Sequence, residues 1–197
     1  MRDLIVTENM TVDGVIDGQE GWFSPSGGDD MAAVTREHMA AADAVLLGRV
    51  TYDQFAGYWP AQTDDTTGVS DYLNRTMKYV VSSSLTTANW QHTTILGGSL
   101  TDHIVTLKRQ PGKDIVATGS VTLVRSLVQE NLVDAYRLFV WPVILGRGRR
   151  LFPEGIASTL RLIETQTFDS GVVLLSYRVA RATEAGAGDE PPAARVP

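Results

Sequence analysis

The feature that most constrains the fold of this chain is a short apolar run that ends in a glycine–arginine pair. Residues 44–47 (AVLL) read as a buried strand, Gly48 and Arg49 form a tight turn, and Thr51 opens a helical pattern. The free N–H groups and positive dipole end of a helix N-terminus favour anions, and Arg49 can add a bidentate contact to a phosphate. The segment therefore predicts a site for a phosphorylated ligand, for which a nucleotide cofactor is our first choice.

Composition excludes several classes of protein. Cysteine is absent from the 197 residues, which rules out disulfides, cysteine-ligated zinc, iron–sulfur clusters and a thiol nucleophile. The three histidines share no metal-ligand spacing, so no metal is expected. A formal net charge of −6 argues against general nucleic-acid binding. No apolar run is long enough for a signal peptide or a membrane span, so we expect a cytoplasmic protein without a membrane partner.

The order of strand and helix patterns predicts an α/β fold with a mixed, mostly parallel central sheet and flanking helices. Helical patterns separate most of the strand patterns, and the last two strands form an antiparallel hairpin at the sheet edge. The length of the chain suggests one domain, residues 1–180, followed by a disordered tail, residues 181–197. The expected strands are residues 4–7, 44–47, 78–82, 94–96, 114–117, 135–145, 160–167 and 172–179.

A second strand–turn–helix junction occurs at residues 118–122 (TGSVT). Gly119 lets the backbone approach a ligand closely, and Ser120 and Thr122 can offer hydroxyl groups to phosphate. Taken alone, Ser120 reads more simply as an ordinary helix N-cap, and the Gly48–Arg49 turn as a plain connection with an exposed arginine. Two such turns in one domain, however, fit a ligand that lies across the carboxyl ends of neighbouring strands.

Three further segments carry polar side chains that can serve either a ligand or the fold. Ser82 and Ser83 can meet a ribose, an adenine edge or a 2′-phosphate, or they can form a solvated loop. Asp13 can orient a polar substrate or relay a proton, but an Asp-Gly pair is also a common turn. Trp22 lies in a loop that can cover a planar ligand.

Three arginines lie within four residues after a long strand pattern, at Arg147, Arg149 and Arg150. They can bind a substrate phosphate or form a solvated basic loop, and the sequence favours neither. The chain has no GxSxG elbow, no Walker A loop and no complete GxGxxG pattern. Nucleophilic hydrolases and the usual dinucleotide-binding Rossmann domain are therefore poor matches.

Five segments, taken in order, resemble the dihydrofolate reductase superfamily. The closer similarity is to its bacterial branch, the reductase domain of the riboflavin-biosynthesis deaminase/reductase. The matching segments are MTVDG at 10–14, LLGRVTY at 46–52, VVSSSL at 80–85, IVATGSVTLVRSL at 115–127 and FVWPVILGRGRRLF at 139–152.

This resemblance implies a three-layer dihydrofolate-reductase-like fold with NADPH across the strand ends. It assigns the cofactor phosphates to Gly48, Arg49 and Thr51. It assigns the adenosine part of the cofactor to Ser82 and Ser83. It matches the family's pyrophosphate-binding turn to Gly119, Ser120, Val121 and Thr122. Thr11 stands where the riboflavin branch has serine in its SLDG motif, and it is counted with the cofactor site. The resemblance also implies a homodimer joined through the C-terminal strands.

Departures from the family pattern bear on the substrate. Dihydrofolate reductase has a Gly-Gly pair where this chain has Gly119-Ser120, and the residues that flank Asp29 and Asp30 do not match its substrate-binding acid. The chain also has neither the length nor the cysteines of a fused zinc deaminase domain. These differences favour a stand-alone pyrimidine reductase-like domain over a folate enzyme.

The leading hypothesis is an NADPH-dependent reductase that transfers hydride to a heterocyclic substrate, of the 5-amino-6-(5-phosphoribosylamino)uracil reductase type. Asp13 is the expected catalytic acid and Asp30 the second choice. Trp22 and the three arginines are the expected substrate contacts. A true dihydrofolate reductase, a protein that binds NADPH without turnover, and a dimeric structural domain that binds nothing are the alternatives.

Overall fold

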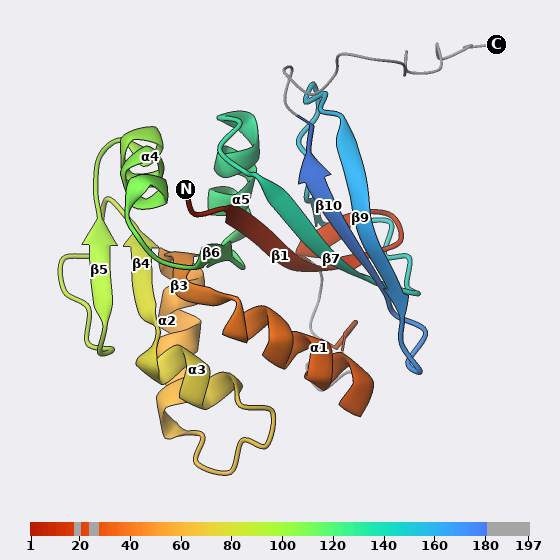
Figure 1. Ribbon diagram of the computed structural model, residues 1–197, viewed down its shortest axis with the longest axis horizontal. Helices are drawn as coiled ribbons and strands as arrows, with labels where there is room; N and C mark the ends of the chain where they lie inside the picture. The colour runs from red at the N-terminus through yellow and green to blue at the C-terminus, as the bar shows by residue number, and fades with distance from the viewer. Residues whose placement is uncertain (18–20, 24–27, 181–197) are drawn as a thin grey trace.

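The computed structural model describes residues 1–17, 21–23 and 28–180, and within these ranges it contains an eight-stranded sheet (Figure 1). Five parallel pairings join the first six strands of the sheet, and two antiparallel pairings add the last two. The order across the sheet is β5 (Thr93–Leu96), β4 (Met77–Val81), β3 (Ala42–Gly48), β6 (Asp114–Ala117), β1 (Leu4–Thr11), β7 (Ala135–Trp141), β10 (Val173–Val179) and β9 (Leu160–Thr167).

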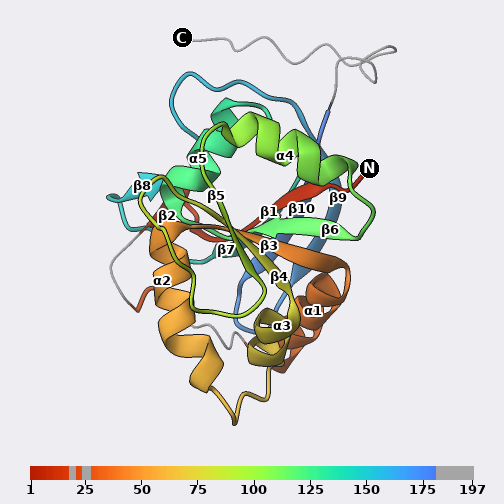
Figure 2. The same ribbon diagram turned by 90° about the vertical axis from the view of Figure 1, so that its left-hand side faces the viewer.

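Helices cover both faces of the sheet, which gives three layers (Figure 2). Figure 2 shows α4 and α5 on one side of the sheet and α1 and α3 on the other. The helices are α1 (Asp29–Ala40), α2 (Arg49–Tyr58), α3 (Val69–Arg75), α4 (Leu100–Arg109) and α5 (Val121–Gln129), with a short 3₁₀ turn at η1 (Trp59–Ala61). This confirms the α/β fold and its mixed, mostly parallel sheet. None of the described helices is long and apolar enough to cross a membrane.

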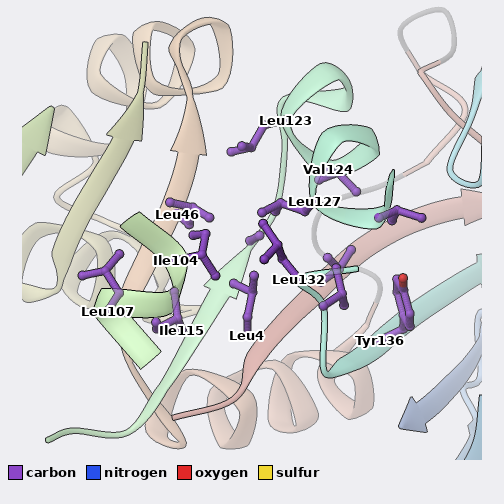
Figure 3. Close-up of a cluster of buried hydrophobic side chains, with 14 of the residues drawn as sticks. Leu4, Leu46, Ile104, Leu107, Ile115, Leu123, Val124, Leu127, Leu132 and Tyr136 are labelled. Carbon is purple, nitrogen blue, oxygen red and sulfur yellow. The ribbon is translucent and has the colours of Figure 1, made fainter. Parts of the chain in front are cut away.

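The largest buried cluster lies between the sheet and the α4–α5 layer (Figure 3). Leu4 and Ile115 from adjacent strands are fully buried there, and they meet Ile104 of α4 and Leu127 of α5. Apolar residues at helical spacing on α5 form its buried face, as the sequence predicts. A second cluster joins α1 to β7 and β10, and a third joins α2 and α3 to β3 and β4. The central strands are therefore covered on both faces.

Element boundaries differ from the expected ones mainly in β1 and β7. The first strand continues past residue 7 to Thr11, because its polar half pairs in parallel with β7. The strand expected over residues 135–145 ends at Trp141 instead, because Pro142 has no N–H to donate to the sheet. The expected tail, residues 181–197, and part of the loop that contains Trp22, residues 24–27, lie outside the described residues.

A small second sheet was not expected. It pairs β2 (Val15–Asp17) with β8 (Arg149–Arg150) in antiparallel orientation. This sheet fastens the arginine segment to the loop that follows β1. Gly148 is required at its edge, because a Cβ atom there would lie 2.4 Å from the carbonyl oxygen of Asp17.

Candidate active site

A cavity of about 640 Å³ surrounds the carboxyl ends of the central strands, where ligands bind in open parallel sheets. Its volume lies within the range of small-molecule and cofactor sites. The wall is built from β1, the first turns of α2 and α5, part of α1 and the β2–β8 sheet. The lining residues are Thr7, Glu8, Asn9, Ile16, Asp17, Trp22, Phe23, Met31, Thr35, Val50, Thr51, Gln54, Phe55, Trp59, Thr118, Gly119, Ser120, Val121, Thr122, Phe139 and Arg149.

The two turns that the sequence singles out are in direct contact. The N–H of Gly48 donates to the carbonyl oxygen of Gly119 at 3.1 Å. A Cβ atom on Gly48 would lie 2.2 Å from the Ser120 hydroxyl, and one on Gly119 would lie 2.9 Å from the Thr51 hydroxyl. Gly119 also has a φ of 107°, which favours glycine. Glycine at both positions lets the two turns form one wall of the cavity.

Both helices that start at these turns have uncapped N-termini. The N-cap residues, Gly48 for α2 and Ser120 for α5, make no side-chain capping bond, and neither first turn contains an acidic residue. By contrast, the Ser99 side chain caps α4 by accepting from the N–H of Asp102. Two free helix N-termini therefore face the same cavity, which suits the phosphates of a dinucleotide.

The predicted cofactor residues fall into two groups. Thr51 and the four residues from Gly119 to Thr122 line the cavity, and Gly48 lies directly behind Ser120. Arg49 lies on the surface at the start of α2, where its Nη1 donates to Asp53 at 2.9 Å. Ser82 and Ser83 follow β4 outside the cavity wall, and the Ser82 hydroxyl accepts from the N–H groups of Ser84 and Leu85.

Thr11 and Asp13 form a turn beside the cavity. The Thr11 hydroxyl is buried and donates to Asp13 Oδ1 at 2.6 Å, and the Asp13 carboxylate also accepts from the N–H groups of Gly146 and Leu145. The Thr11 hydroxyl, followed by these N–H groups, lowers the pKa of Asp13 to about 2. The carboxylate thus fixes the loop after β7, and Asp13 is outside the set of cavity-lining residues.

Asp30 is engaged in a similar way at the start of α1. Its carboxylate accepts from the N–H groups of Met31 and Asp169, each at 2.8 Å, and the Asp169 contact is the largest cause of its lowered pKa. Asp30 therefore ties α1 to the turn between β9 and β10. It does not contribute to the cavity wall.

The expected substrate contacts are also divided. Trp22 and Arg149 line the cavity, and Arg149 Nε donates to Asp17 at 2.5 Å across the β2–β8 sheet. Arg150 lies outside the wall and donates to the carbonyl oxygen of Asp13 at 3.1 Å. Arg147 is exposed on the same loop, also outside the wall.

Glu8, which lies on β1 and lines the cavity, was not among the predicted site residues. Its Oε1 is buried and has no hydrogen-bond partner among the described residues, and burial raises the pKa of the carboxyl to about 8. A period-two reading of β1 could have identified it, because Glu8 follows Leu4 and Val6 on the buried face of the strand.

The RibD C-terminal domain family matches residues 2–174, nearly the whole described chain. The chain belongs to this family. Two relatives from Bacillus subtilis (strain 168) are the uncharacterized proteins YyaP and YwjB. YyaP is 30% identical over 179 residues, which cover 89% of this chain and 94% of YyaP. YwjB is 29% identical over 177 residues, which cover 88% of this chain and 96% of YwjB.

Solved structures share the RibD-type fold. A putative riboflavin biosynthesis protein from Shewanella sp. PV-4 has a TM-score of 0.71 at 20% identity, over 91% of this chain and 99% of its own. A pyrimidine reductase-like protein from Corynebacterium diphtheriae has a TM-score of 0.64 at 16% identity, over 91% and 92%. A deaminase/5-amino-6-(5-phosphoribosylamino)uracil reductase from Thermotoga maritima has a TM-score of 0.62 at 15% identity, over 91% of this chain but 57% of its own. The predicted dihydrofolate-reductase-like fold is thereby confirmed.

Proposed function

We propose that this chain is an NADPH-dependent reductase of the pyrimidine-reductase type. Membership of the RibD C-terminal domain family supports an oxidoreductase. The observation that carries the proposal is the pair of uncapped helix N-termini, on α2 and α5, that line one cavity through the contact between Gly48 and Gly119. A dinucleotide has phosphates that suit these N–H groups and flat rings that suit the apolar part of the wall.

The residues present fit such a cofactor. Gly48 and Gly119 let the two turns approach closely, because the Ser120 and Thr51 hydroxyls take the space that Cβ atoms would fill. The N-termini of α2 and α5 are thereby brought together for a phosphate. Thr51 and Thr122 add hydroxyl groups beside them. Arg49, at the start of α2, has a guanidinium group that can contact the cofactor phosphates. In this structure it donates to Asp53, one helical turn later.

The chemistry follows from this arrangement. When bound, the dihydronicotinamide supplies a hydride, here to the carbon of a C=N or C=O group in a heterocyclic substrate. The chain's own part is to position the two molecules and to exclude water from the reacting atoms. Trp22 and Phe23, in edge-on contact at 4.9 Å between ring centroids, cover the α1 side of the cavity for a planar ring. Arg149 lies on the rim as a contact for a substrate phosphate.

A binding and turnover experiment tests this function. NADPH is titrated into the protein by calorimetry, with NADH as the comparison, and tryptophan fluorescence is followed in parallel because Trp22 and Trp59 line the cavity. The loss of NADPH absorbance is then measured with 5-amino-6-(5-phosphoribosylamino)uracil and, separately, with dihydrofolate. We expect NADPH to be oxidised in the presence of the pyrimidine substrate and not in the presence of dihydrofolate. Turnover with dihydrofolate would instead identify a folate enzyme, and binding without any turnover would identify a cofactor-binding protein.

We also propose that two copies pair through the C-terminal strands. β9 forms one edge of the sheet, and Leu162 and Ile163 on it are 51% and 55% exposed. Unpaired edge strands with apolar side chains favour association. Analytical ultracentrifugation should show a dimer for the unmodified protein and a monomer for Leu162→Lys. A monomer at every concentration of the unmodified protein would contradict pairing.

A further inference from the structure

The cavity contains an acid on the central strand, Glu8. On β1, Leu4, Val6 and Glu8 share the face that packs toward α5, and the first two are fully buried. The pairing between β1 and β6 ends where Val6 meets Ala117, so β1 continues past the end of β6. Glu8 therefore lies beside the turn that begins at Thr118, with buried Leu138 of β7 as its register partner. An acid at this point is next to the wall that we assign to the cofactor.

The other charged side chains around the cavity are engaged elsewhere. Asp17 and Arg149, the remaining charged residues that line it in the described chain, pair with each other. On α5, Arg125 donates to the carbonyl oxygen of Arg150. At the first turns of the other two helices, Arg49 pairs with Asp53 on α2, and Asp30 accepts backbone N–H groups on α1. Each of these cations thus has a partner other than the Glu8 carboxyl.

These surroundings favour the neutral form of the Glu8 carboxyl. Its Oε1 is withdrawn from solvent and finds no donor among the described residues. A carboxylate oxygen that is buried without a partner is unfavourable, so the group keeps its proton instead. The pKa of about 8 agrees with this geometry. Glu8 is thus a protonated acid at neutral pH, whereas the Asp13 carboxylate holds a loop in its ionised form.

We propose that Glu8 is the catalytic acid that delivers the proton consumed in the reduction, an inference that rests on the proposed function. As the substrate carbon gains hydride, the π electrons of its C=N or C=O bond move to the heteroatom. The O–H bond of Glu8 breaks, and its proton forms the new N–H or O–H bond. Glu8 remains as a carboxylate and regains a proton from water before the next turnover. The substrate thus gains one hydride and one proton, and NADPH is oxidised to NADP⁺.

The first test compares two Glu→Gln variants in the reductase assay. Because Gln cannot release a proton, Glu8→Gln should lower kcat by about a hundredfold or more, with little change in NADPH affinity below pH 8. Glu8→Asp should keep part of the activity. The matched control is Glu37→Gln, which changes an exposed glutamate on α1 and should leave kcat unchanged. Unchanged kcat in Glu8→Gln, together with intact NADPH binding, overturns the role of Glu8 and leaves the proposed function standing.

The second test needs no turnover. In protein labelled with ¹³C at glutamate side-chain carboxyls, one resonance should titrate near pH 8 and be absent from Glu8→Gln. Since the oxidised nicotinamide ring is cationic, ionised Glu8 should also favour NADP⁺ over NADPH. The affinity for NADP⁺ relative to that for NADPH should therefore increase as the pH rises through 8 in the unmodified protein. Glu8→Gln should show no such increase.

The outcomes separate the two proposals. A Glu8 resonance that titrates near the ordinary glutamate value of 4.5 overturns the acid role, even if Glu8→Gln does not fold. A Kd ratio that does not depend on pH in the unmodified protein places Glu8 away from the reacting ring and also overturns it. Failure of the unmodified protein to bind NADPH rejects the proposed function, and the role of Glu8 with it.

Discussion

The backbone N–H of Gly48 donates to the carbonyl oxygen of Gly119 at 3.1 Å, and this bond joins the starts of two helices that are distant in sequence. Neighbouring strands β3 and β6 bring the two turns together. The wall that we assign to the cofactor is therefore a property of the sheet register, and a small change at either turn should affect both.

Gly48→Ala should disrupt this wall. The new Cβ atom would lie 2.2 Å from the Ser120 hydroxyl and 3.0 Å from its backbone nitrogen, so the turn has to move. We expect a loss of about 1–3 kcal/mol in the free energy of unfolding, measured with urea, and weaker NADPH binding. The control is Gly57→Ala on α2, where nothing lies within 4 Å. That change should stabilise the protein by roughly 0.5–1 kcal/mol and leave NADPH affinity unchanged.

Arg49→Ala should affect binding more than folding. The exposed Arg49–Asp53 pair contributes only about 0.3–0.5 kcal/mol to stability. One lost charge-assisted contact to phosphate should cost roughly 1.5–3 kcal/mol of NADPH binding, measured by calorimetry. Arg109→Ala removes an exposed arginine from the last turn of α4 and should leave the affinity unaltered. If Arg49→Ala and Arg109→Ala bind NADPH with equal affinity, Arg49 does not contact the cofactor phosphates.

Asp13→Asn should lower the melting temperature in a pH-dependent way. The folded-state pKa of Asp13, about 2, lies below its ordinary value of 3.8, so ionised Asp13 stabilises the fold above that value. This stabilisation is lost as the pH falls from 3.8 to about 2, and the difference in Tm between Asp13→Asn and the unmodified protein should shrink over that window. Asp64→Asn, which changes an exposed aspartate without a hydrogen-bond partner in the described chain, should show no such trend. Thermal unfolding followed by circular dichroism measures both.

Lys78 should make the protein more stable at alkaline pH. Its side chain is fully buried, donates to the carbonyl oxygens of Leu73 and Thr76, and lies 4.4 Å from the ring centroid of Trp90. Burial lowers the pKa of the Lys78 ammonium from 10.5 to about 8. Between these two values the folded state has released a proton that the unfolded chain still binds, so stability rises with pH.

The measurement for Lys78 is the urea midpoint across that pH interval. The midpoint should increase with pH in the unmodified protein, and Lys78→Met should remove most of the increase. A matching change at exposed Lys113, whose Nζ donates to the carbonyl oxygen of Ala40, should leave the trend in place. The same slope in Lys78→Met as in the unmodified protein would show that other groups cause it.

Local sequence signals predicted much of the fold. The strand at residues 114–117 and the one at 160–167 have the expected bounds, because glycine, proline or turn residues limit them on both sides. No such signal marks α3. That short helix is held by buried Tyr72 and Leu73, which pack in one cluster with residues of β3 and β4. Packing against strands from other parts of the chain does not appear in a local pattern.

The sequence predicts the two glycine turns of the candidate site but not its proposed catalytic acid, Glu8. The junctions at Gly48 and Gly119 follow buried strands and begin helices, so the sequence marks both. Asp13 and Glu8 are both acidic residues near the end of β1, and only the tertiary structure distinguishes their roles. Asp13 meets N–H groups from the loop after β7, whereas Glu8 enters a cavity formed by segments far away in the chain. Burial and hydrogen bonding, which separate the two, depend on tertiary structure.

The position of β1 in the middle of the sheet has a consequence for synthesis of the chain. Leu4 pairs with Ile115 on one side, and Thr11 pairs with Trp141 on the other. A ribosome releases β1 long before either neighbouring strand exists, and a central strand has no stable partner until then. Only when β7 has emerged can the cavity around Glu8 close. Nascent chains that stop before β7 should therefore expose apolar β1 and depend on chaperones to stay unaggregated.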